Sequence, residues 1–153
     1  MENANKQKTI LVSMSGGVDS SVAALLLKQQ GYRVIGCFLK LYSDTKNKLS
    51  GECSYLEERA MALKIAALLN IPLVTLDFER AYKKQVLAPM FQAYARGLTP
   101  NPDTLCNSMI KFPFVWKAAR KVKADFIATG HYARIHKTPH GLELLQGKDK
   151  EKD

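Results

Sequence analysis

Glycine, serine and aspartate residues that can bind phosphate stand together near the start of the chain, in the string Ser15-Gly16-Gly17-Val18-Asp19-Ser20. The apolar run from Ile10 to Val12 precedes the string and a periodic apolar segment follows it, which predicts a strand, a turn and a helix. Glycine permits positive φ and a close approach of the backbone to an anion, and the N–H groups at a helix start favour negative charge. Serine hydroxyls add donors, and Asp19 can hold a metal ion that bridges phosphate oxygens. The string therefore predicts a phosphate-binding loop.

This loop lacks the lysine with which a Walker A loop reaches the β and γ phosphates. It suits a pyrophosphate that is released better than a γ-phosphoryl group that is transferred. The alternative is an ordinary tight turn with a helix cap, which a lone Gly-Gly pair would favour. The full string resembles the pyrophosphate loop of the ATP pyrophosphatase superfamily, whose members adenylate a substrate and then displace the AMP.

A cysteine and an aspartate form a second group of candidate residues, in the segment from Thr99 to Asn107. Two prolines restrict its backbone, so we expect a stiff loop ahead of a helix over residues 108–122. Cys106 falls at or near the start of that helix, where the helix dipole is expected to lower the thiol pKa. Asp103 can accept a proton from the thiol, although its charge disfavours the thiolate. The alternatives are a buried apolar role for Cys106 and a capping role for Asp103.

Strands and helices alternate along the chain, which predicts a three-layer α/β/α fold with a doubly wound, Rossmann-like parallel sheet. Ligands of such folds bind outside the carboxyl ends of the strands. We therefore expect the glycine loop and the turn Gly130-His131-Tyr132 to share one crevice, with Phe38 and Leu39 beside an adenine. Strands are expected at 9–14, 33–39, 73–76 and 126–129, helices at 20–30, 56–69, 79–96 (kinked at Pro89) and 108–122, and a hairpin at 132–146.

Apolar periodicity also predicts which side chains face the core. It places Val22, Leu25 and Leu26 on the inner face of the first helix, and it favours a core position for Phe112 and Trp116 over stacking on a base. His131 has two equal interpretations, as a residue that lines the nucleotide site or as a structural residue. The other two histidines, His136 and His140, are expected on the surface.

Length and charge limit the class of protein. A chain of 153 residues is expected to form one domain, and its net charge of +9 fits a polyanionic partner such as RNA. Residues 1–8 are polar and are expected to be a flexible arm rather than a secretory signal. No apolar run is long enough to cross a membrane, so the expected location is the cytoplasm. One local group of basic residues has the spacing of a solvated helix face: Lys111, Lys117, Arg120, Lys121 and Lys123.

The three cysteines lack close pairs, which argues against a disulfide framework and against a C-x-x-C metal site. No metal ligands are therefore assigned from spacing. Cys37 falls in a predicted strand and is expected in the core. Cys53 is interpreted as an incidental thiol, for which a metal role stays open.

The string TPNPDTLCN at 99–107, with SGGVDS upstream and ATGHYAR downstream, resembles the tRNA-specific 2-thiouridylase family over essentially the whole chain. The resemblance implies an ATP-binding domain of the adenine nucleotide alpha hydrolase type over 9–147 and the start of a tRNA-contacting segment over 148–153. It implies an ATP site made of Ser13, Met14, Ser15, Gly16, Gly17, Val18, Asp19, Ser20, Leu39 and Gly130. It implies tRNA contacts at Asn101, Pro102, Asp103, Lys152 and Asp153, and catalytic roles for Cys106 and Asp103.

The same resemblance implies a reaction. With ATP and Mg²⁺, the C2 oxygen of the wobble uridine of a tRNA is adenylated, a persulfide sulfur attacks that carbon, and AMP leaves. The persulfide stands on a second, downstream cysteine and is supplied by a sulfur-relay protein or a cysteine desulfurase. Cys106 releases the sulfur by forming a disulfide with that cysteine, and some members hold an iron–sulfur cluster instead.

The 153 residues lack the family's second cysteine, its central domain and its C-terminal β-barrel. We therefore expect an N-terminal fragment that binds ATP and does not complete sulfur transfer alone. Three alternatives stay open: another adenylating pyrophosphatase, such as a lysidine synthetase-like or amidotransferase-type enzyme; a non-enzymatic ATP-binding module of the universal-stress type; and a truncated pseudoenzyme that binds only nucleotide or RNA. The Asn-Pro-Asp-x-x-Cys-Asn string argues against the first.

Overall fold

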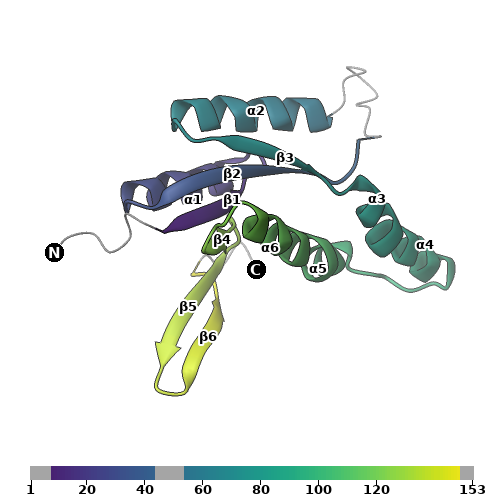
Figure 1. Ribbon diagram of the computed structural model, residues 1–153. Coiled ribbons are helices and arrows are strands. Elements are labelled where there is room, and N and C mark those ends of the chain that lie inside the picture. Colours follow the sequence, from purple (N-terminus) through teal and green to yellow (C-terminus); the bar gives the residue numbers. More distant parts are fainter. Residues whose placement is uncertain (1–7, 44–53, 149–153) are drawn as a thin grey trace.

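Four parallel strands form the main sheet, in the spatial order β3-β2-β1-β4 (Figure 1). The structure, a computed structural model, describes residues 8–43 and 54–148. Cys53, Lys152, Asp153 and all of the predicted arm except Lys8 lie outside the described residues. The strands are β1 Thr9–Ser13, β2 Arg33–Lys40, β3 Leu73–Asp77 and β4 Phe126–Ala128.

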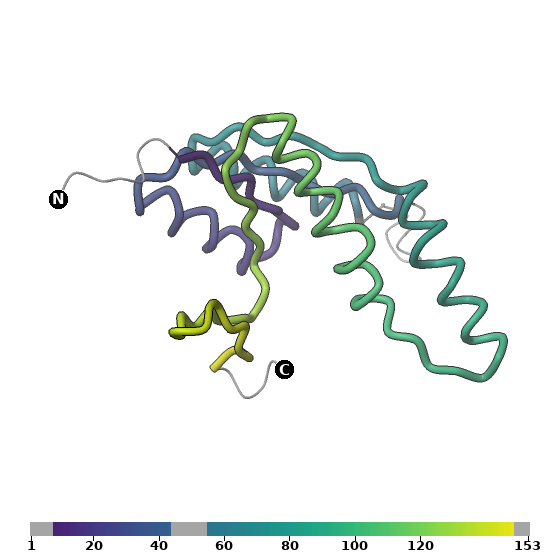
Figure 2. Tube along the Cα trace, turned by 60° about the horizontal axis from the view of Figure 1, so that its bottom comes forward, coloured from purple at the N-terminus to yellow at the C-terminus, as the bar shows by residue number. Residues whose placement is uncertain are grey.

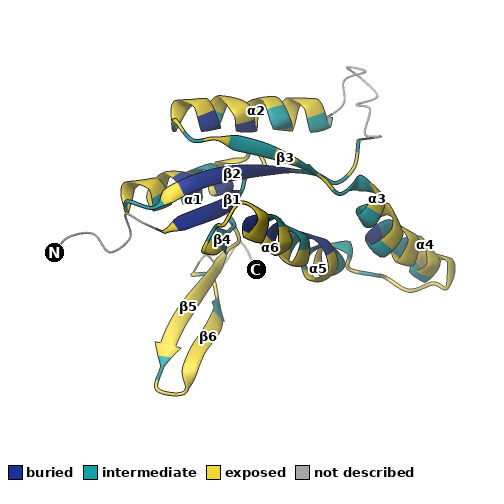
Figure 3. Cartoon of the chain, in the orientation of Figure 1, coloured by how far each residue is buried: buried dark blue, intermediate teal, exposed yellow. Residues whose placement is uncertain are grey.

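Helices cover both faces of this sheet, which confirms the predicted three-layer, doubly wound fold (Figures 1 and 3). The crossovers from β1 to β2 and from β2 to β3 place α1 and α2 on one face. The chain returns to β4 through α6 on the opposite face. These helices are α1 Val18–Gln29, α2 Ser54–Leu68 and α6 Phe112–Lys121.

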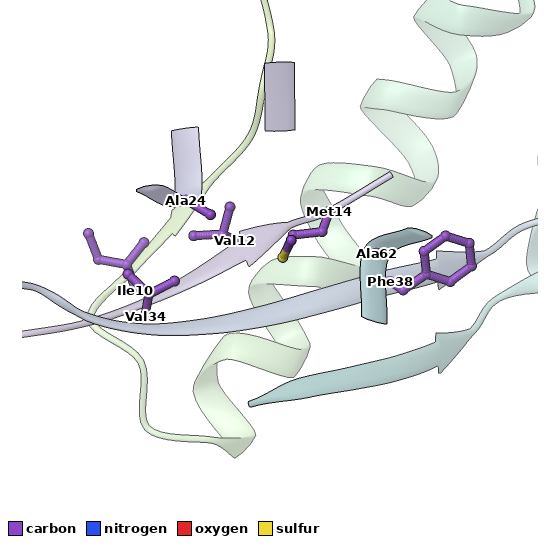
Figure 4. Packing of buried hydrophobic residues seen from close by; sticks show 7 residues of the cluster. All are labelled: Ile10, Val12, Met14, Ala24, Val34, Phe38 and Ala62. Carbon is purple, nitrogen blue, oxygen red and sulfur yellow. The ribbon is translucent and has the colours of Figure 1, made fainter. Parts of the chain in front are cut away.

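The core forms because successive strand residues point to opposite faces of the sheet. Ile10 and Val12 of β1 pack in the cluster under α1 and α2 (Figure 4), whereas Leu11 between them packs in the cluster under α6. All three are at most 4% exposed. A parallel strand covered on both faces needs such a continuous apolar run, so the sequence of β1 fits only a central strand.

Small side chains bring the helices close to the sheet. Ala24 of α1, Ala62 of α2 and Ala119 of α6 are all fully buried, at 0% exposed. A methyl group permits a shorter separation between helix and sheet than a leucine or an aromatic ring would. The inner faces of α1 and α2 are therefore defined by alanines, and that of α6 by Val115 and Ala119.

The prediction that larger apolar residues face the core is wrong for five side chains. They are between 38% and 48% exposed: Val22, Leu25, Leu26, Phe112 and Trp116. Apolar residues stand on more than one face of these helices, so periodicity alone does not identify the face that packs on the sheet. The predictions for Cys37, which is buried, and for His136 and His140, which are exposed, are confirmed.

Two antiparallel helices connect β3 to β4 and extend beyond the sheet (Figure 2). They touch through an apolar cluster of Val86, Cys106 and Ile110. The first helix consists of α3 Glu79–Tyr82, the π-helical turn η1 Lys83–Leu87 and α4 Ala88–Ala95. The second consists of α5 Pro102–Leu105, the π-helical turn η2 Cys106–Lys111 and α6.

Each π-helical turn comes just before a proline, Pro89 after η1 and Pro113 after η2. A proline ring lacks an N–H and clashes with the carbonyl four residues earlier. Those carbonyls belong to Gln85 and Met109, which lie inside the two π-helical turns. The wider turn relieves this clash, so the irregularity expected at Pro89 takes the form of a π-helical turn ahead of the proline.

The predicted hairpin is present as a separate two-stranded sheet, β5 Ala133–Thr138 and β6 Gly141–Gln146, which projects away from the main sheet (Figure 1). Apolar side chains on one of its faces, Ile135, Leu142 and Leu144, are 72% to 78% exposed. None of the helices in the described part of the chain combines the length and apolarity that a membrane span requires.

Leu11 provides a test of the arrangement of the sheet. Leu11→Ala should lower the free energy of unfolding by about 2–5 kcal/mol, because the side chain is 0% exposed and leaves a cavity under α6. Leu142→Ala, in the hairpin at 73% exposure, is the control and should change it by less than about 0.5 kcal/mol. Urea denaturation followed by circular dichroism measures both. If Leu11→Ala changes the free energy of unfolding as little as Leu142→Ala does, β1 is not a central strand.

Candidate functional site

A cavity of about 400 Å³ opens at the carboxyl ends of β1, β2 and β4. This is the edge at which open parallel sheets bind their ligands. The cavity combines hydroxyl, carboxylate and ammonium groups with an apolar wall. Its lining residues are Ser13, Met14, Ser15, Asp19, Ser20, Phe38, Leu39, Leu41, Glu58, Lys111, Thr129, Gly130 and His131.

The glycine loop carries its hydroxyls on a fixed backbone. The N–H of Ser15 donates to Ser20 Oγ over 3.2 Å, and the N–H of Gly17 donates to Ser15 Oγ over 3.3 Å. The hydroxyls of Ser20 and Ser21 both donate to the Gly17 carbonyl, over 3.2 and 2.6 Å. The loop therefore leads into α1 with its serine hydroxyls already oriented, two of them in the cavity wall.

The first turn of α1 has no side-chain cap. Its N-cap residue is Gly17, which has no side chain to accept hydrogen bonds from the first N–H groups. These groups carry the positive end of the helix dipole, and Asp19 and Ser20 of the same turn line the cavity. The cavity wall thus offers backbone donors of the kind that bind phosphate at a helix start.

Two glycines fix the loop against its neighbours. Gly16 has φ +84°, and a Cβ atom there would stand 2.5 Å from the Glu58 carbonyl oxygen of α2. A Cβ atom on Gly130 would stand 2.6 Å from the Ser20 nitrogen. Both approaches are too short for any other residue. The loop is therefore held between α2 and the turn after β4, which forms one wall of the cavity.

Seven of the ten residues predicted for the ATP site line this cavity: Ser13, Met14, Ser15, Asp19, Ser20, Leu39 and Gly130. Gly16, Gly17 and Val18 shape the loop without lining the cavity, and Val18 is 76% exposed. Phe38, expected beside an adenine, is also in the wall. The prediction omitted Leu41, Glu58, Lys111 and Thr129, which reach the cavity from other elements. Thr129 lies inside the string ATGHYAR at 128–134, whereas the other three lie outside the three strings that carry the resemblance.

His131 connects the turn after β4 to η2. Its Nδ1 lies 2.6 Å from Thr129 Oγ1 and its Nε2 lies 3.3 Å from Asn107 Oδ1. Its ring centroid is 5.5 Å from that of Phe112. Partial burial lowers the pKa of His131, and the positive charge of Lys111 lowers it further. The lowered pKa favours the neutral imidazole, in which Nε2 donates to Asn107 Oδ1 and Nδ1 accepts from the Thr129 hydroxyl.

The predicted stiff loop is wrong for residues 102–107, because the helix begins earlier than expected. Asn101 Oδ1 accepts the N–H groups of Asp103 and Thr104 over 3.0 and 3.1 Å, and Pro102 fits the first helical turn. Asn101 is thus a helix cap, and Asp103 lies exposed in the first turn of the second helix. Only residues 99–101 remain outside the helix.

The early helix start changes the environment of Cys106. The side chain is 5% exposed and packs with Val86 and Ile110 between the two helices. Burial raises its pKa, the Lys111 charge opposes this, and the Asp103 charge raises it further. The predicted lowering of the thiol pKa is therefore wrong, because the positive helix end lies one turn away and the apolar neighbours disfavour the thiolate.

The cavity and the thiol are neighbours through η2. Cys106 is not among the side chains that line the cavity. Leu41, however, lines the cavity and packs against the Cys106 cluster, and Lys111 of the same π-helical turn reaches the cavity. Asn107 next to the thiol contacts His131 in the cavity wall. One short segment thus joins the glycine loop region to the helix that carries the cysteine.

The carboxylates of the cavity fit a nucleotide-bound Mg²⁺ better than an iron–sulfur cluster. Mg²⁺ commonly takes one or two carboxylates together with substrate phosphates. Asp19 supplies such a carboxylate, oriented by the Tyr132 hydroxyl, which donates to Oδ1 over 3.1 Å. No three His, Cys, Asp or Glu side chains converge among the described residues. Cys37 and Cys106 lie in separate apolar clusters, and burial raises the pKa of Cys37 to about 12.

The fold and the site together define an α/β domain with a glycine loop at the carboxyl edge of a parallel sheet. The NMN synthetase from Francisella tularensis shares this fold with a TM-score of 0.50 and 21% identity, over 81% of this chain and 45% of that chain. The NH3-dependent NAD synthetase from Campylobacter jejuni does so with a TM-score of 0.50 and 20% identity, over 82% and 48%. These similarities concern the fold, which is the Rossmann-like type that the sequence predicted.

Sequence comparison identifies the family. The family described as tRNA methyl transferase HUP domain matches residues 8–153, and the chain belongs to it. The tRNA-specific 2-thiouridylase MnmA 1 of Geobacillus kaustophilus is 47% identical over 148 residues, which are 97% of this chain and 40% of that protein. The tRNA-specific 2-thiouridylase MnmA of Bacillus subtilis is 42% identical over 153 residues, which are 100% of this chain and 41% of that protein. The chain thus spans about two fifths of the length of the curated relatives it matches.

The position of Lys111 is tested by the titration of His131. Proton NMR should give His131 a pKa below the ordinary 6.5. Lys111→Met should raise this pKa, because the ammonium disfavours the imidazolium. Lys117→Met, on the exposed side of α6, is the matched control and should leave it unchanged. The same His131 pKa with and without the Lys111 charge would mean that the ammonium lies elsewhere.

Proposed function

We propose that this chain is the nucleotide-binding part of an ATP-dependent tRNA thiolation enzyme that makes 2-thiouridine. In this reaction ATP activates the C2 oxygen of a tRNA uridine by adenylation, so that sulfur can replace that oxygen. The main support for this proposal is the start of α1, which has no side-chain cap and faces a cavity of about 400 Å³ at the carboxyl edge of the sheet. The names of the relatives, tRNA-specific 2-thiouridylases, supply the substrate class.

The cavity suggests how the nucleotide lies. Its polar end is formed by the serines of the glycine loop and by the first turn of α1, which suit the phosphates. Its apolar wall contains Phe38 and Leu39 at the end of β2, which suit the adenine. Asp19 would hold a Mg²⁺ ion, which would neutralise part of the negative charge of the phosphates. The product pyrophosphate would then leave from the glycine loop.

The tRNA would approach from the side of the two antiparallel helices. Asn101, Pro102 and Asp103 begin the second helix, and Asp103 is exposed one turn before Cys106. In this proposal Asp103 exchanges protons with the reacting base or sulfur, which is work for an exposed carboxylate. We also propose tRNA contacts at Lys152 and Asp153, which lie outside the described residues. A division between two domains at residues 147 and 148 is likewise a proposal.

Sulfur would reach the uridine as a persulfide on a second cysteine. Within the described residues the other cysteine is Cys37, which is 0% exposed in the core and cannot serve. The cysteine that carries the persulfide would belong to the part of the longer relatives that this chain does not span. A sulfur-relay protein or a cysteine desulfurase would supply its sulfur. The enzyme would act in the cytoplasm, and the 153 residues alone would not complete sulfur transfer.

A second candidate function is nucleotide or RNA binding without chemistry. The burial of Cys106 favours it, because a thiol that is 5% exposed and has a raised pKa is poorly suited to sulfur exchange. On this alternative the cavity would bind ATP as proposed, but Cys106 would serve only as a small apolar residue between the helices.

ATP binding is tested with two glycines that both have a positive φ. Gly16 has φ +84° and Gly97 has φ +73°, so an alanine strains the backbone at both. Only at Gly16 would the new Cβ meet the Glu58 carbonyl oxygen, which displaces the loop. Calorimetry with Mg²⁺ and ATP should show at least tenfold weaker binding for Gly16→Ala and a change below twofold for Gly97→Ala. Equal affinities would exclude the glycine loop as the phosphate site.

The role of Cys106 is tested in a longer relative that contains this region. Cys106→Ser, made at the matching position, should abolish 2-thiouridine formation while ATP binding stays within twofold. Mass spectrometry of nucleosides from tRNA measures the product. Thiolation at the normal rate in that variant would favour the binding function. Robust thiolation by the 153-residue chain alone would overturn the proposed need for a second part.

A further inference from the structure

We propose that Lys111 binds the phosphate groups of the nucleotide and replaces the lysine that the glycine loop lacks. This inference rests on the proposed function, since it requires that the cavity bind a nucleotide. It assigns to η2 a direct role in the phosphate site. Neither the glycine loop nor the segment around Cys106 indicated this role in the sequence.

The charged residues of the cavity wall favour a role for Lys111. Asp19 and Glu58 are the acidic residues that line the cavity, and Lys111 is the basic residue that lines it. Its histidine, His131, is neutral at neutral pH because of its lowered pKa. Without Lys111 no side chain of the cavity wall would carry a positive charge, and a polyphosphate would have hydroxyls, backbone N–H groups and its own Mg²⁺ as partners. Like charges at such short range oppose binding.

Lys111 differs from the other basic residues near it. Lys117, Arg120, Lys121 and Lys123 are exposed, as the prediction of a solvated helix face requires. Lys111 is half-buried and lines the cavity. It makes no hydrogen bond or ion pair with any of the described residues, so its ammonium has unused donors.

The electrostatic effects of Lys111 locate its charge. Its charge lowers the pKa of His131 in the cavity wall and opposes the rise that burial gives to the pKa of the Cys106 thiol. One ammonium therefore lies close to both the nucleotide cavity and the cysteine. It reaches from η2 the same cavity that Ser15, Asp19 and Ser20 of the glycine loop line.

This position suits the chemistry of a lysine. A lysine ammonium is a compact point charge on a flexible stem, and in Walker A loops it reaches the β and γ phosphates. Here the stem would start from a different element and meet the same groups. A phosphate bound to Lys111 would also withdraw part of the positive charge that supports the Cys106 thiolate, so nucleotide binding and thiol acidity would be linked.

The test compares three variants of the 153-residue chain by calorimetry with Mg²⁺-ATP and with inorganic pyrophosphate. Lys111→Met keeps the length of the side chain and removes its charge, so it should weaken the binding of both ligands by about 10- to 100-fold. Lys111→Arg should restore most of the affinity. Lys117→Met, an exposed residue on the same helix, should change it by less than twofold. Thermal melting checks that all variants fold.

The outcomes separate this inference from the proposed function. If Lys111→Met binds both ligands as tightly as the natural chain while Gly16→Ala binds them weakly, the role of Lys111 is wrong and the nucleotide site stands. If the natural chain binds neither ligand, both proposals are overturned. If Lys111→Met and Lys117→Met lose the same affinity, the loss comes from the lower net positive charge of the chain. That result would also refute a specific contact between Lys111 and the phosphates.

Discussion

The site depends on one packing constraint, the close approach of two glycines to neighbouring backbone. Gly16 lies against the Glu58 carbonyl of α2, and Gly130 lies against the start of α1 at Ser20. Together they hold the first turn of a 12-residue helix at the carboxyl edge of the sheet, with its N–H groups uncapped by a side chain. The helix dipole, the serine hydroxyls and the cavity follow from that placement. Any side chain at either glycine would move the turn.

The second part of the site depends on the two prolines in the antiparallel helices. Pro89 and Pro113 each follow a π-helical turn, and the two turns pack against each other through Val86, Cys106 and Ile110. In η2, Cys106 lies in the apolar cluster and Lys111, five residues later, lines the cavity. The same helix thus contributes to both the thiol cluster and the cavity wall.

Much of this could be predicted from local patterns. The strand, glycine loop and helix near the N-terminus form a short continuous string, and its residues line the cavity as a group. The parallel sheet followed from the alternation of strands and helices. Family membership followed from three strings in a fixed order.

Other features could not be predicted, because they arise from contacts between distant segments. The inner faces of α1 and α6 are set by Ala24 in α1 and by Val115 and Ala119 in α6, and not by the larger apolar residues that were predicted to face the core. The thiol pKa of Cys106 depends on burial between two helices. Glu58 and Lys111 enter the cavity from α2 and η2, far from the glycine loop in sequence. The spacing of residues along the sequence does not predict contacts between such distant segments.

The central claim is that the start of α1 binds phosphate. An NMR titration of the isotope-labelled chain with pyrophosphate tests it most directly, because each amide of the loop reports its own environment. The account predicts that the largest shifts occur at the amides of residues 16–20 and at Gly130. Shifts centred instead on Arg134 and Lys148, which line a second cavity between α1 and the hairpin, would contradict it.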